Sequence, residues 1–578
     1  MGSVNSARKS VLLPHPVVET EYGFIEGKKM LLPDGKVANV FLGVPFAKPP
    51  VGDLRFRKPE KPDPWSTPRK CNKYSNLSIQ KTFVVYAVTG KYSEDCLHLN
   101  IVAPDWSPPE DSKGFPVMLY IHGGGFMIDS GVRYNYRKVG RTLVRHGVIV
   151  VITSYRLGLL GFFCTNDDTS VGNYGIWDQV FALKFVYENI SKFGGDPGNI
   201  TVFGQSAGGI SSDLLSILPI SKHMVNKVGV LGGNCETAWG VYTRYSMAKH
   251  CQMLAKKLGF RRSSTGRFTQ EENLKMLLYF KSLPSSSFEM PILGARFVYK
   301  NLKLEVGPIV DGDLIPAPPY ILRKIAPPKP VMAGVTLHEG LVFLAARDKF
   351  TSKSVYLDLQ QKFIVMDKIV TAVYGPEAGL SINEVRKSYG ITDLSIKDKK
   401  FLNKTIVQIL DDNINKYALY NYCQSERSLG STVWMYVFEH HNPGIISHFS
   451  LLIPFNAASH GTEIFYLMGH NMYFKSVRET REDKIVTELF TKMYTNFAKY
   501  GNPNGVPSNS RDSVPGDVVW EPVTEDYPER HMRILEKPIL VDEFETRRLE
   551  KFSEFYSKFC HYSCDPEIFE NGKYENKE

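Results

Sequence analysis

The chain has 578 residues, of which 43% are hydrophobic and 22% are charged. This is ordinary globular usage, which supports a large buried core and excludes collagen-like and disordered classes. The net charge of +10 is mild for this length, and no dense Lys/Arg run with interleaved aromatics predicts nucleic-acid binding. The basic excess fits either an ordinary solvated surface or a weak attraction to anionic lipid.

The N-terminus, MGSVNSARKS, has no apolar core of signal-peptide length, so we expect a cytoplasmic protein. Gly2 and Ser6 stand in the positions of an N-myristoylation signal, with Arg8 and Lys9 just beyond. One acyl chain binds membranes only marginally, and a basic pair adds a second weak attraction. The pattern predicts either a myristoylated protein with peripheral membrane association or an unmodified flexible tail.

Buried strands and helices alternate through the first half of the chain. Short apolar runs at 117–121, 148–153 and 200–203 predict buried strands, and Asp178–Ser191 predicts a helix between the last two. Apolar strands that alternate with helices are typical of a mainly parallel sheet with helices on both faces. We therefore expect an α/β fold.

The second half of the chain is more helical and more charged, notably over residues 240–420. Near the end, Asp483–Tyr500 predicts an amphipathic helix. No linker is long and polar enough to separate independent domains. The prediction is a flexible tail at 1–15, one domain with a helical cap or subdomain at 16–560, and a second tail at 561–578.

The pentapeptide Gly204-Gln205-Ser206-Ala207-Gly208 has the G-x-S-x-G form of a nucleophile elbow. It follows a predicted strand and precedes an apolar, helix-like segment, which is the context such an elbow requires. Alone, the five residues could equally be a glycine-rich structural turn. Their context favours a serine nucleophile at Ser206.

The segment His122-Gly123-Gly124-Gly125 follows the predicted strand at 117–121. An HGGG segment upstream of a nucleophile elbow is the expected source of an oxyanion hole. Backbone N–H groups of Gly124 and Gly125, together with that of Ala207, would hold the developing negative charge. Taken alone the segment is equally a tight turn, and its pairing with the elbow makes it specific.

A serine nucleophile needs a base and an orienting acid, which follow it in the order acid, then histidine. The chain has 14 histidines and most lie beyond Ser206, so spacing alone does not choose the base. His460, in a turn-like segment of small residues, is the first candidate, and His441 and His448 remain as alternatives. Glu339, which follows an apolar run and precedes a glycine, is the candidate acid.

The chain resembles the type-B carboxylesterase/cholinesterase family over almost its whole length. That resemblance implies an α/β-hydrolase fold with a mostly parallel central sheet and a helical cap. The matching segments are Phe41–Ala47, Pro49–Phe56, Ser93–Asn100, Tyr155–Gly158, Gly172–Gly209 and Phe497–Asn504.

The resemblance also selects the base and the acid, because residues 334–340 look like the family's catalytic glutamate segment and residues 460–463 like its histidine segment. It implies that Ser206 is the nucleophile, His460 the general base and acid, and Glu339 the group that orients His460. The implied reaction is hydrolysis of a small-molecule carboxylic ester through an acyl-enzyme, without metal or cofactor. The implied oxyanion hole is Gly124, Gly125 and Ala207.

The chain departs from the family pattern at three places. Gln205 stands where glutamate is usual, and no tryptophan lies between Cys71 and Cys96, so a choline cation would lack both an anionic neighbour and its strongest cation–π partner. We therefore expect a carboxylesterase and not a cholinesterase. Cys71 and Cys96 occupy positions resembling the family's first disulfide. Gly232-Gly233 replaces a common Ser-Gly.

Two other functions remain as alternatives to ester hydrolysis. An acyltransferase would use the same triad and pass the acyl group to an alcohol or amine, and water exclusion would decide between the two. A non-catalytic adhesion or binding protein is the other, since the family contains members that lost the nucleophile. The intact Ser206, Glu339 and His460 argue against that reading.

Overall fold

The computed structural model describes residues 14–81, 91–262, 265–289, 303–345, 386–392, 395–450, 452–470, 477–506, 514, 518–545 and 549. Gly2 and the two predicted tails beyond residues 14 and 549 lie outside this set, so the myristoylation signal and the C-terminal domain boundary stay predictions. None of the described helices combines the length and apolarity that a bilayer span requires.

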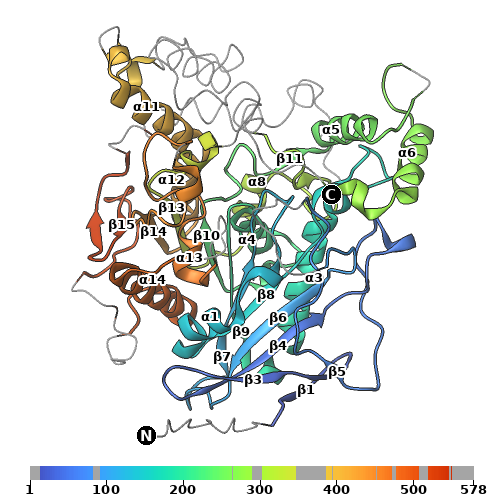
Figure 1. Ribbon diagram of the computed structural model, residues 1–578, viewed down its shortest axis with the longest axis horizontal. Coiled ribbons are helices and arrows are strands. Elements are labelled where there is room, and N and C mark those ends of the chain that lie inside the picture. Colours follow the sequence, from blue (N-terminus) through green and yellow to red (C-terminus); the bar gives the residue numbers. More distant parts are fainter. Residues whose placement is uncertain are drawn as a thin grey trace, which may run out of the picture.

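An 11-stranded sheet forms the centre of the described structure, in the order β16-β15-β14-β13-β10-β9-β7-β8-β6-β4-β3 (Figure 1). Its strands are parallel from β8 through β15 and antiparallel towards both edges. The expected mostly parallel sheet is thus confirmed. The bounds are β3 Lys28–Leu31, β4 Val37–Pro45, β6 His98–Pro104, β7 Phe115–Ile121, β8 Ile149–Thr153, β9 Gly195–Gln205, β10 Lys227–Leu231, β13 Val331–Thr336, β14 Val433–Phe438, β15 His531–Ile534 and β16 Ile539–Val541.

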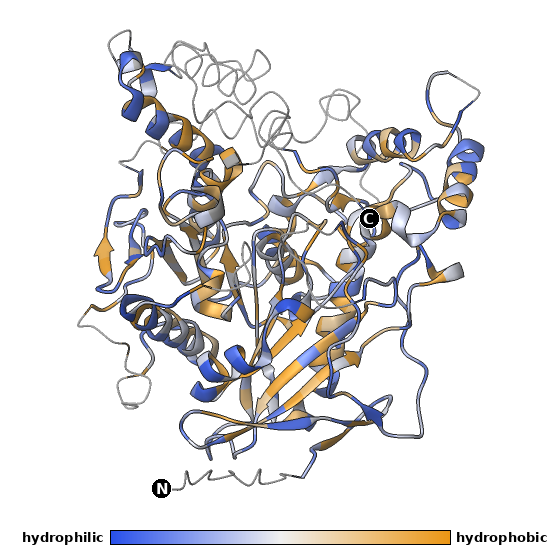
Figure 2. Ribbon diagram, viewed as in Figure 1, coloured by the Kyte–Doolittle hydropathy of each residue, from blue (hydrophilic) through white to orange (hydrophobic). Residues whose placement is uncertain are grey.

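Both faces of the sheet are buried, and β7 shows how. Val117, Leu119 and Ile121 point into one hydrophobic core, whereas Met118 and Tyr120 point into a second core on the opposite face. Successive side chains of a strand alternate between faces, so a strand covered on both sides reads as a continuous apolar run. Figure 2 shows the resulting apolar strands at the centre of the molecule.

Helices cover both faces of the sheet. The first core is shared with α2 Gly158–Phe162, α3 Tyr174–Asn189 and α4 Ala207–Ile217, and the second with α1 Tyr136–Thr142, α13 Ile464–Met468 and α14 Arg481–Tyr500. The predicted helix at 483–500 is confirmed as α14, which begins in a capping box at Thr480. The helix predicted from Asp178 begins earlier, at Tyr174, because its first turn is also buried and follows Asn173 at φ 56°.

Most of the regular structure described in the region 240–420 is helical, as expected, although strands β11, β12 and β13 also lie there. Helices α5 Arg244–Lys257 and α6 Gln270–Ser282 lie together at one corner, and α11 Lys399–Asp411 and α12 Tyr417–Ser428 lie on the other side (Figure 1). A π-helical turn, Asp412–Lys416, joins α11 to α12. The remaining described elements are α8 Pro319–Lys324 and the short strands β1 Val17–Thr20, β2 Gly23–Glu26, β5 Arg69–Lys70, β11 Tyr242–Thr243 and β12 Ile309–Val310.

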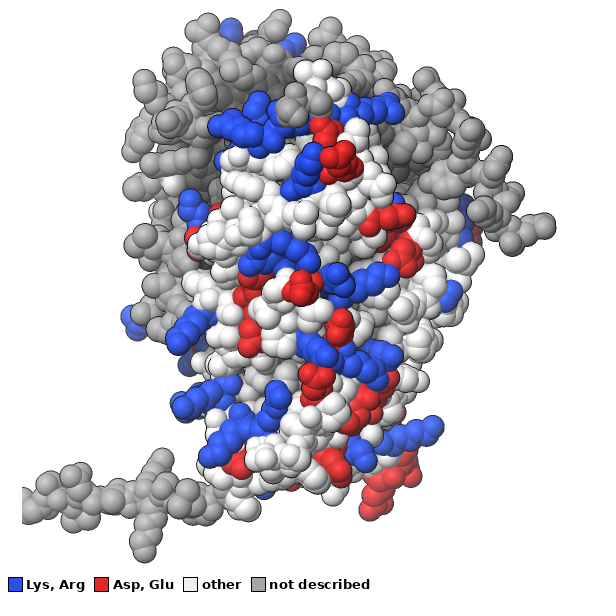
Figure 3. Space-filling model, turned by 90° about the vertical axis from the view of Figure 1, so that its right-hand side faces the viewer, with Lys and Arg blue, Asp and Glu red and all other residues white. Residues whose placement is uncertain are grey.

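The face of the molecule shown in Figure 3 carries basic and acidic side chains interleaved with uncharged surface. On this face the charges form no broad patch of one sign. The mild net charge of +10 therefore fits an ordinary solvated surface there.

Candidate active site

Ser206 occupies a sharp turn between strand β9 and helix α4. Its backbone has φ 60° and ψ −125°, a strained conformation for a residue with a side chain, and its N–H donates to the carbonyl of Leu231 at 2.7 Å. The turn brings Gly208 so close to β7 that a Cβ atom on it would lie 2.0 Å from the carbonyl oxygen of Ile121. The glycine at this position is therefore required by contact, and the turn has the form of a nucleophile elbow.

A continuous hydrogen-bonded chain joins the three residues that the sequence singled out. His460 Nε2 lies 2.8 Å from the hydroxyl oxygen of Ser206, and His460 Nδ1 lies 2.5 Å from Oε2 of Glu339. The three side chains are 254 and 121 residues apart along the chain, respectively. The fold thus assembles a nucleophile, a base and an acid in the geometry of a serine hydrolase triad.

Glu339 follows strand β13 and is completely buried. Its Oε1 accepts hydrogen bonds from the backbone N–H and the hydroxyl of Thr336, at 2.6 and 2.9 Å, and its Oε2 accepts one from Asn415 at 2.7 Å. Burial alone would raise the pKa of Glu339, but the charge of His460 and these hydrogen bonds outweigh it and hold the pKa below its usual value. Glu339 is therefore kept as a carboxylate.

The loop after β7 lies directly against the nucleophile. A Cβ atom on Gly123 would be 3.0 Å from Cβ of Ser206, and Gly124 and Gly125 follow with φ 92° and 61°. Within the part of the chain that is described, the N–H groups of Gly124, Gly125 and Ala207 donate no hydrogen bond. Free N–H groups beside a serine hydroxyl are what an oxyanion hole requires.

Of the two alternative bases, His441 makes no hydrogen bond to Ser206. His441 follows β14 and its ring nitrogens have no hydrogen-bond partner among the described residues, and burial lowers its pKa to about 4. The side chain of His448 lies outside the described residues. Of the candidate bases, the structure brings His460 to the nucleophile.

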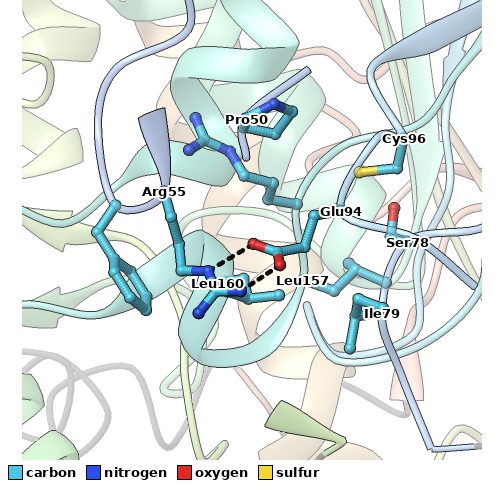
Figure 4. A pocket seen from close by; sticks show the side chains of 10 residues that line it. Pro50, Arg55, Ser78, Ile79, Glu94, Cys96, Leu157 and Leu160 are labelled. Atoms are coloured by element: carbon cyan, nitrogen blue, oxygen red, sulfur yellow. Dashed lines mark hydrogen bonds and ion pairs between the residues drawn. The ribbon is translucent and has the colours of Figure 1, made fainter. Parts of the chain in front are cut away.

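The expected disulfide between Cys71 and Cys96 is not formed, and both cysteines are buried free thiols. Figure 4 shows Cys96 beside Ser78 at the wall of a small cavity, where Arg55 is paired with Glu94 at 2.7 Å. The two thiols have different charged neighbours, because the charge of Arg69 acts on the Cys71 thiol and not on the Cys96 thiol. Burial raises the pKa of each to about 12, which suppresses the thiolate that disulfide exchange needs.

Gln205, the residue before the nucleophile, faces the histidine. Its amide nitrogen lies 3.3 Å from Nε2 of His460, the ring nitrogen that also contacts Ser206. The Gln205 amide also lowers the pKa of Glu463, but burial and the charge of Glu339 outweigh it and hold that pKa well above its usual range. A neutral side chain at position 205 thus stands between the histidine and a second buried carboxyl group.

Sequence reasoning missed three residues that contact the triad. They are Asn415 and Thr336, which donate to Glu339, and Phe343, whose ring centroid lies 5.3 Å from that of His460. Thr336 belongs to the segment that resembles the family's glutamate segment, so its nearness could have been guessed. Asn415 lies within a helical stretch that carries no catalytic motif, and no signal in the sequence distinguishes it.

The described geometry agrees with the comparison to known proteins. The model of the carboxylesterase family matches residues 14–552. This chain belongs to the carboxylesterase family. It is a carboxylic ester hydrolase of the serine hydrolase type with an α/β-hydrolase fold.

The proteins similar to this chain include an esterase, an acyl-CoA hydrolase precursor and a neuroligin. The esterase cest-33 of Caenorhabditis elegans is 34% identical over 512 residues, which cover 87% of each chain. The medium-chain fatty acyl-CoA hydrolase precursor of Anas platyrhynchos is 30% identical, with 85% of each chain covered. Neuroligin-3 of Mus musculus is 30% identical over 87% of this chain and 64% of its own length.

Proposed function

We propose that this protein hydrolyses carboxylic esters through an acyl-enzyme on Ser206, with His460 as general base and acid and Glu339 as its orienting carboxylate. The observation that carries the proposal is the unbroken hydrogen-bonded chain from Ser206 Oγ through His460 to Glu339. A histidine held on both sides in this way has its Nδ1 proton on the Glu339 side and its Nε2 lone pair facing the serine.

The reaction then follows from the positions of these groups. His460 takes the proton of Ser206 as its hydroxyl oxygen attacks the ester carbonyl, and Glu339 stabilises the charged imidazolium that results. The N–H groups of Gly124, Gly125 and Ala207 hold the negative charge on the carbonyl oxygen. His460 returns the proton to the leaving alcohol, and water activated by the same ring releases the acid.

Gln205 favours uncharged esters over choline esters in this proposal. The site has a neutral amide 3.3 Å from the base where the family usually has a carboxylate. Glu463, the next carboxyl group, is held protonated by burial and by the charge of Glu339, which raises its pKa. Among the described residues that contact the triad, Glu339 is therefore the group that carries a negative charge, and its Oε2 is already hydrogen-bonded to His460.

Acyl transfer to an alcohol or amine uses the same residues and remains the alternative outcome. A non-catalytic adhesion or binding role would leave the assembled triad without a purpose. The assembled contacts among Ser206, His460 and Glu339 support catalysis over that role.

The deciding experiment treats purified protein and Ser206→Ala with a fluorophosphonate probe and a short-chain nitrophenyl ester. We expect labelling and hydrolysis in the wild type, and the loss of both in Ser206→Ala. Labelling without turnover would favour transfer to an acceptor that is not yet supplied. Folded wild-type protein that shows neither would refute the proposed catalytic function.

A further inference from the structure

Gly232 lies against the hydrogen bond between Glu339 and His460 and has no side chain to crowd it. Gly232 follows strand β10 with φ 57°, and a Cβ atom there would lie 3.2 Å from Oε2 of Glu339 and 3.3 Å from Nδ1 of His460. Any side chain at this position would press against the hydrogen bond between the acid and the base. With glycine there, position 232 offers only its backbone carbonyl.

The side chain of Asn415 uses that opening. Its amide nitrogen donates to Oε2 of Glu339 at 2.7 Å and to the carbonyl oxygen of Gly232 at 2.8 Å. Two acceptors on one side of the amide fix its orientation, because a flipped amide would set its oxygen against a carboxylate and a carbonyl. Asn415 is buried, with 1% of its surface exposed, so these bonds do not compete with bulk water.

A distortion of the helix places Asn415 at this point. The residue lies in the π-helical turn Asp412–Lys416 between α11 and α12. Such single π turns within α-helices change the direction of side chains and occur often at functional sites. The turn is anchored from outside, since the indole N–H of Trp239 donates to the carbonyl of Ile414 at 3.0 Å.

We propose that Asn415 is a positioning residue of the triad: through Gly232 it is fixed in place, and it holds Oε2 of Glu339 ionised and directed at His460. Thr336 holds the other carboxylate oxygen. Each oxygen of Glu339 thus has its own donor, and the acid cannot rotate away from the base without breaking a buried hydrogen bond to a charged group.

The inference predicts a change in pH dependence as well as in rate. The donor from Asn415 is among the groups that lower the pKa of Glu339 against the effect of burial. Without it, the pKa of Glu339 rises, the carboxylate takes up a proton at higher pH, and the acidic limb of the pH–rate profile moves upward. The other ionisable groups around Glu339 are His460, Glu463 and Tyr436, together with Asp411, which accepts a hydrogen bond from the N–H of the adjacent Gly340.

The test compares Asn415→Leu with Asn413→Leu, a variant in the same π turn. Asn413 donates to the carbonyl oxygen of Ile409 at 2.7 Å, a bond within the helix, so its replacement controls for damage to the turn. For Asn415→Leu we expect kcat to fall about 10–100-fold, the range for a buried hydrogen bond to a charge, with KM within about threefold. We also expect its acidic limb at higher pH, and Asn413→Leu to keep the wild-type limb.

A second variant, Asn415→Asp, keeps the shape of the side chain and removes the amide donor. At pH 8 it is expected to lose at least about tenfold in kcat. Wild-type kcat in either Asn415 variant would overturn the inference, and so would a fall in kcat with an unmoved acidic limb or an equal fall in Asn413→Leu.

The inference rests on the proposed function, and Ser206→Ala separates the two. If Ser206→Ala loses hydrolysis while Asn415→Leu behaves as wild type, only the role of Asn415 is refuted. If Ser206→Ala retains hydrolysis, the proposed function is refuted together with it.

Discussion

Two buried carboxyl groups, Glu339 and Glu463, lie near the triad, and the protein treats them in opposite ways. Glu339 receives donors from Thr336, Asn415 and His460, and its pKa is lowered although burial alone would raise it. Glu463 is buried too, and the donors near it, the N–H groups of Gly461 and Glu463 and the amide of Gln205, lower its pKa less than burial and the charge of Glu339 raise it. Burial and the charge of Glu339 raise its pKa well above the usual range.

The difference shows that burial alone does not set the charge of these groups; the charge of the neighbouring group, His460 or Glu339, and the hydrogen-bond donors decide it. A carboxylate survives in the interior where N–H and O–H groups replace its lost water, and it becomes a neutral acid where they are missing. Because Glu339 is already charged, a second charge at Glu463 would also repel it. Of these two carboxyl groups, Glu339 therefore carries the negative charge, on the side of His460 away from the serine.

Replacing each of the two glutamates, Glu339 and Glu463, by glutamine should give the largest difference in activity. Glu339→Gln removes the charge that stabilises the imidazolium and permits the wrong tautomer, so we expect kcat to fall by about 10³–10⁴-fold. Glu463→Gln replaces a group that is already neutral, and we expect kcat within about threefold of the wild type at pH 7.5. Steady-state hydrolysis of a nitrophenyl ester measures both.

Thermal unfolding of the two variants controls for damage to the fold. Similar losses of kcat in both, with both folded, would contradict the assignment of opposite charge states. A large loss in Glu463→Gln alone would mean that the second carboxyl group is ionised and takes part in the reaction.

Sequence reasoning found the groups that do chemistry but not the groups that set their charge. The G-x-S-x-G elbow and the HGGG loop are local patterns, so Ser206 and the glycines could be read directly from the sequence. Spacing left His460, His441 and His448 open, and only the family resemblance chose among them. The fold class was equally accessible, because strands buried on both faces are continuous apolar runs.

The environment of Glu339 and Glu463 depends on contacts between distant segments. Asn415 lies 76 residues from Glu339 in the chain and contacts it from a π turn that no sequence pattern predicts. The pairing of Cys71 with Cys96 was wrong for a related reason. The resemblance fixed their positions in the chain, whereas the direction of each thiol depends on the packing around it.

Gln205→Glu would add a negative charge beside Nε2 of His460, on the side that faces Ser206, where the protein now has a neutral amide. We expect the ratio of kcat/KM for acetylcholine to that for its uncharged isostere, 3,3-dimethylbutyl acetate, to rise about tenfold. That factor corresponds to about 1.4 kcal/mol, below the roughly 2 kcal/mol of two unit charges ~8 Å apart at an effective dielectric constant of about 20. An unchanged ratio would mean that the charge of residue 205 does not reach the substrate.

A matched measurement is needed because Glu463 lies close to the new carboxyl group. The double variant Gln205→Glu/Glu463→Gln removes the chance that the two acids share one proton. The double variant should show the larger change in selectivity, since no neutral acid at position 463 can donate a proton to its new carboxylate.

The smallest expected effect concerns stability. The folded protein keeps a proton on Glu463 that the unfolded chain releases above its ordinary pKa of 4.5. The unfolded state therefore binds fewer protons than the folded state above pH 4.5, and the free energy of unfolding falls as the pH rises towards the raised pKa of the folded protein.

The glutamine of Glu463→Gln does not titrate, so this decrease in the free energy of unfolding should be absent from the variant. Its free energy of unfolding relative to the wild type should therefore increase between pH 5 and pH 8. Urea unfolding at both pH values measures the difference, with the exposed Glu525→Gln as the control that should show none. A constant offset between the two pH values would mean that Glu463 is ionised in the folded protein, and the contrast with Glu339 would then be lost.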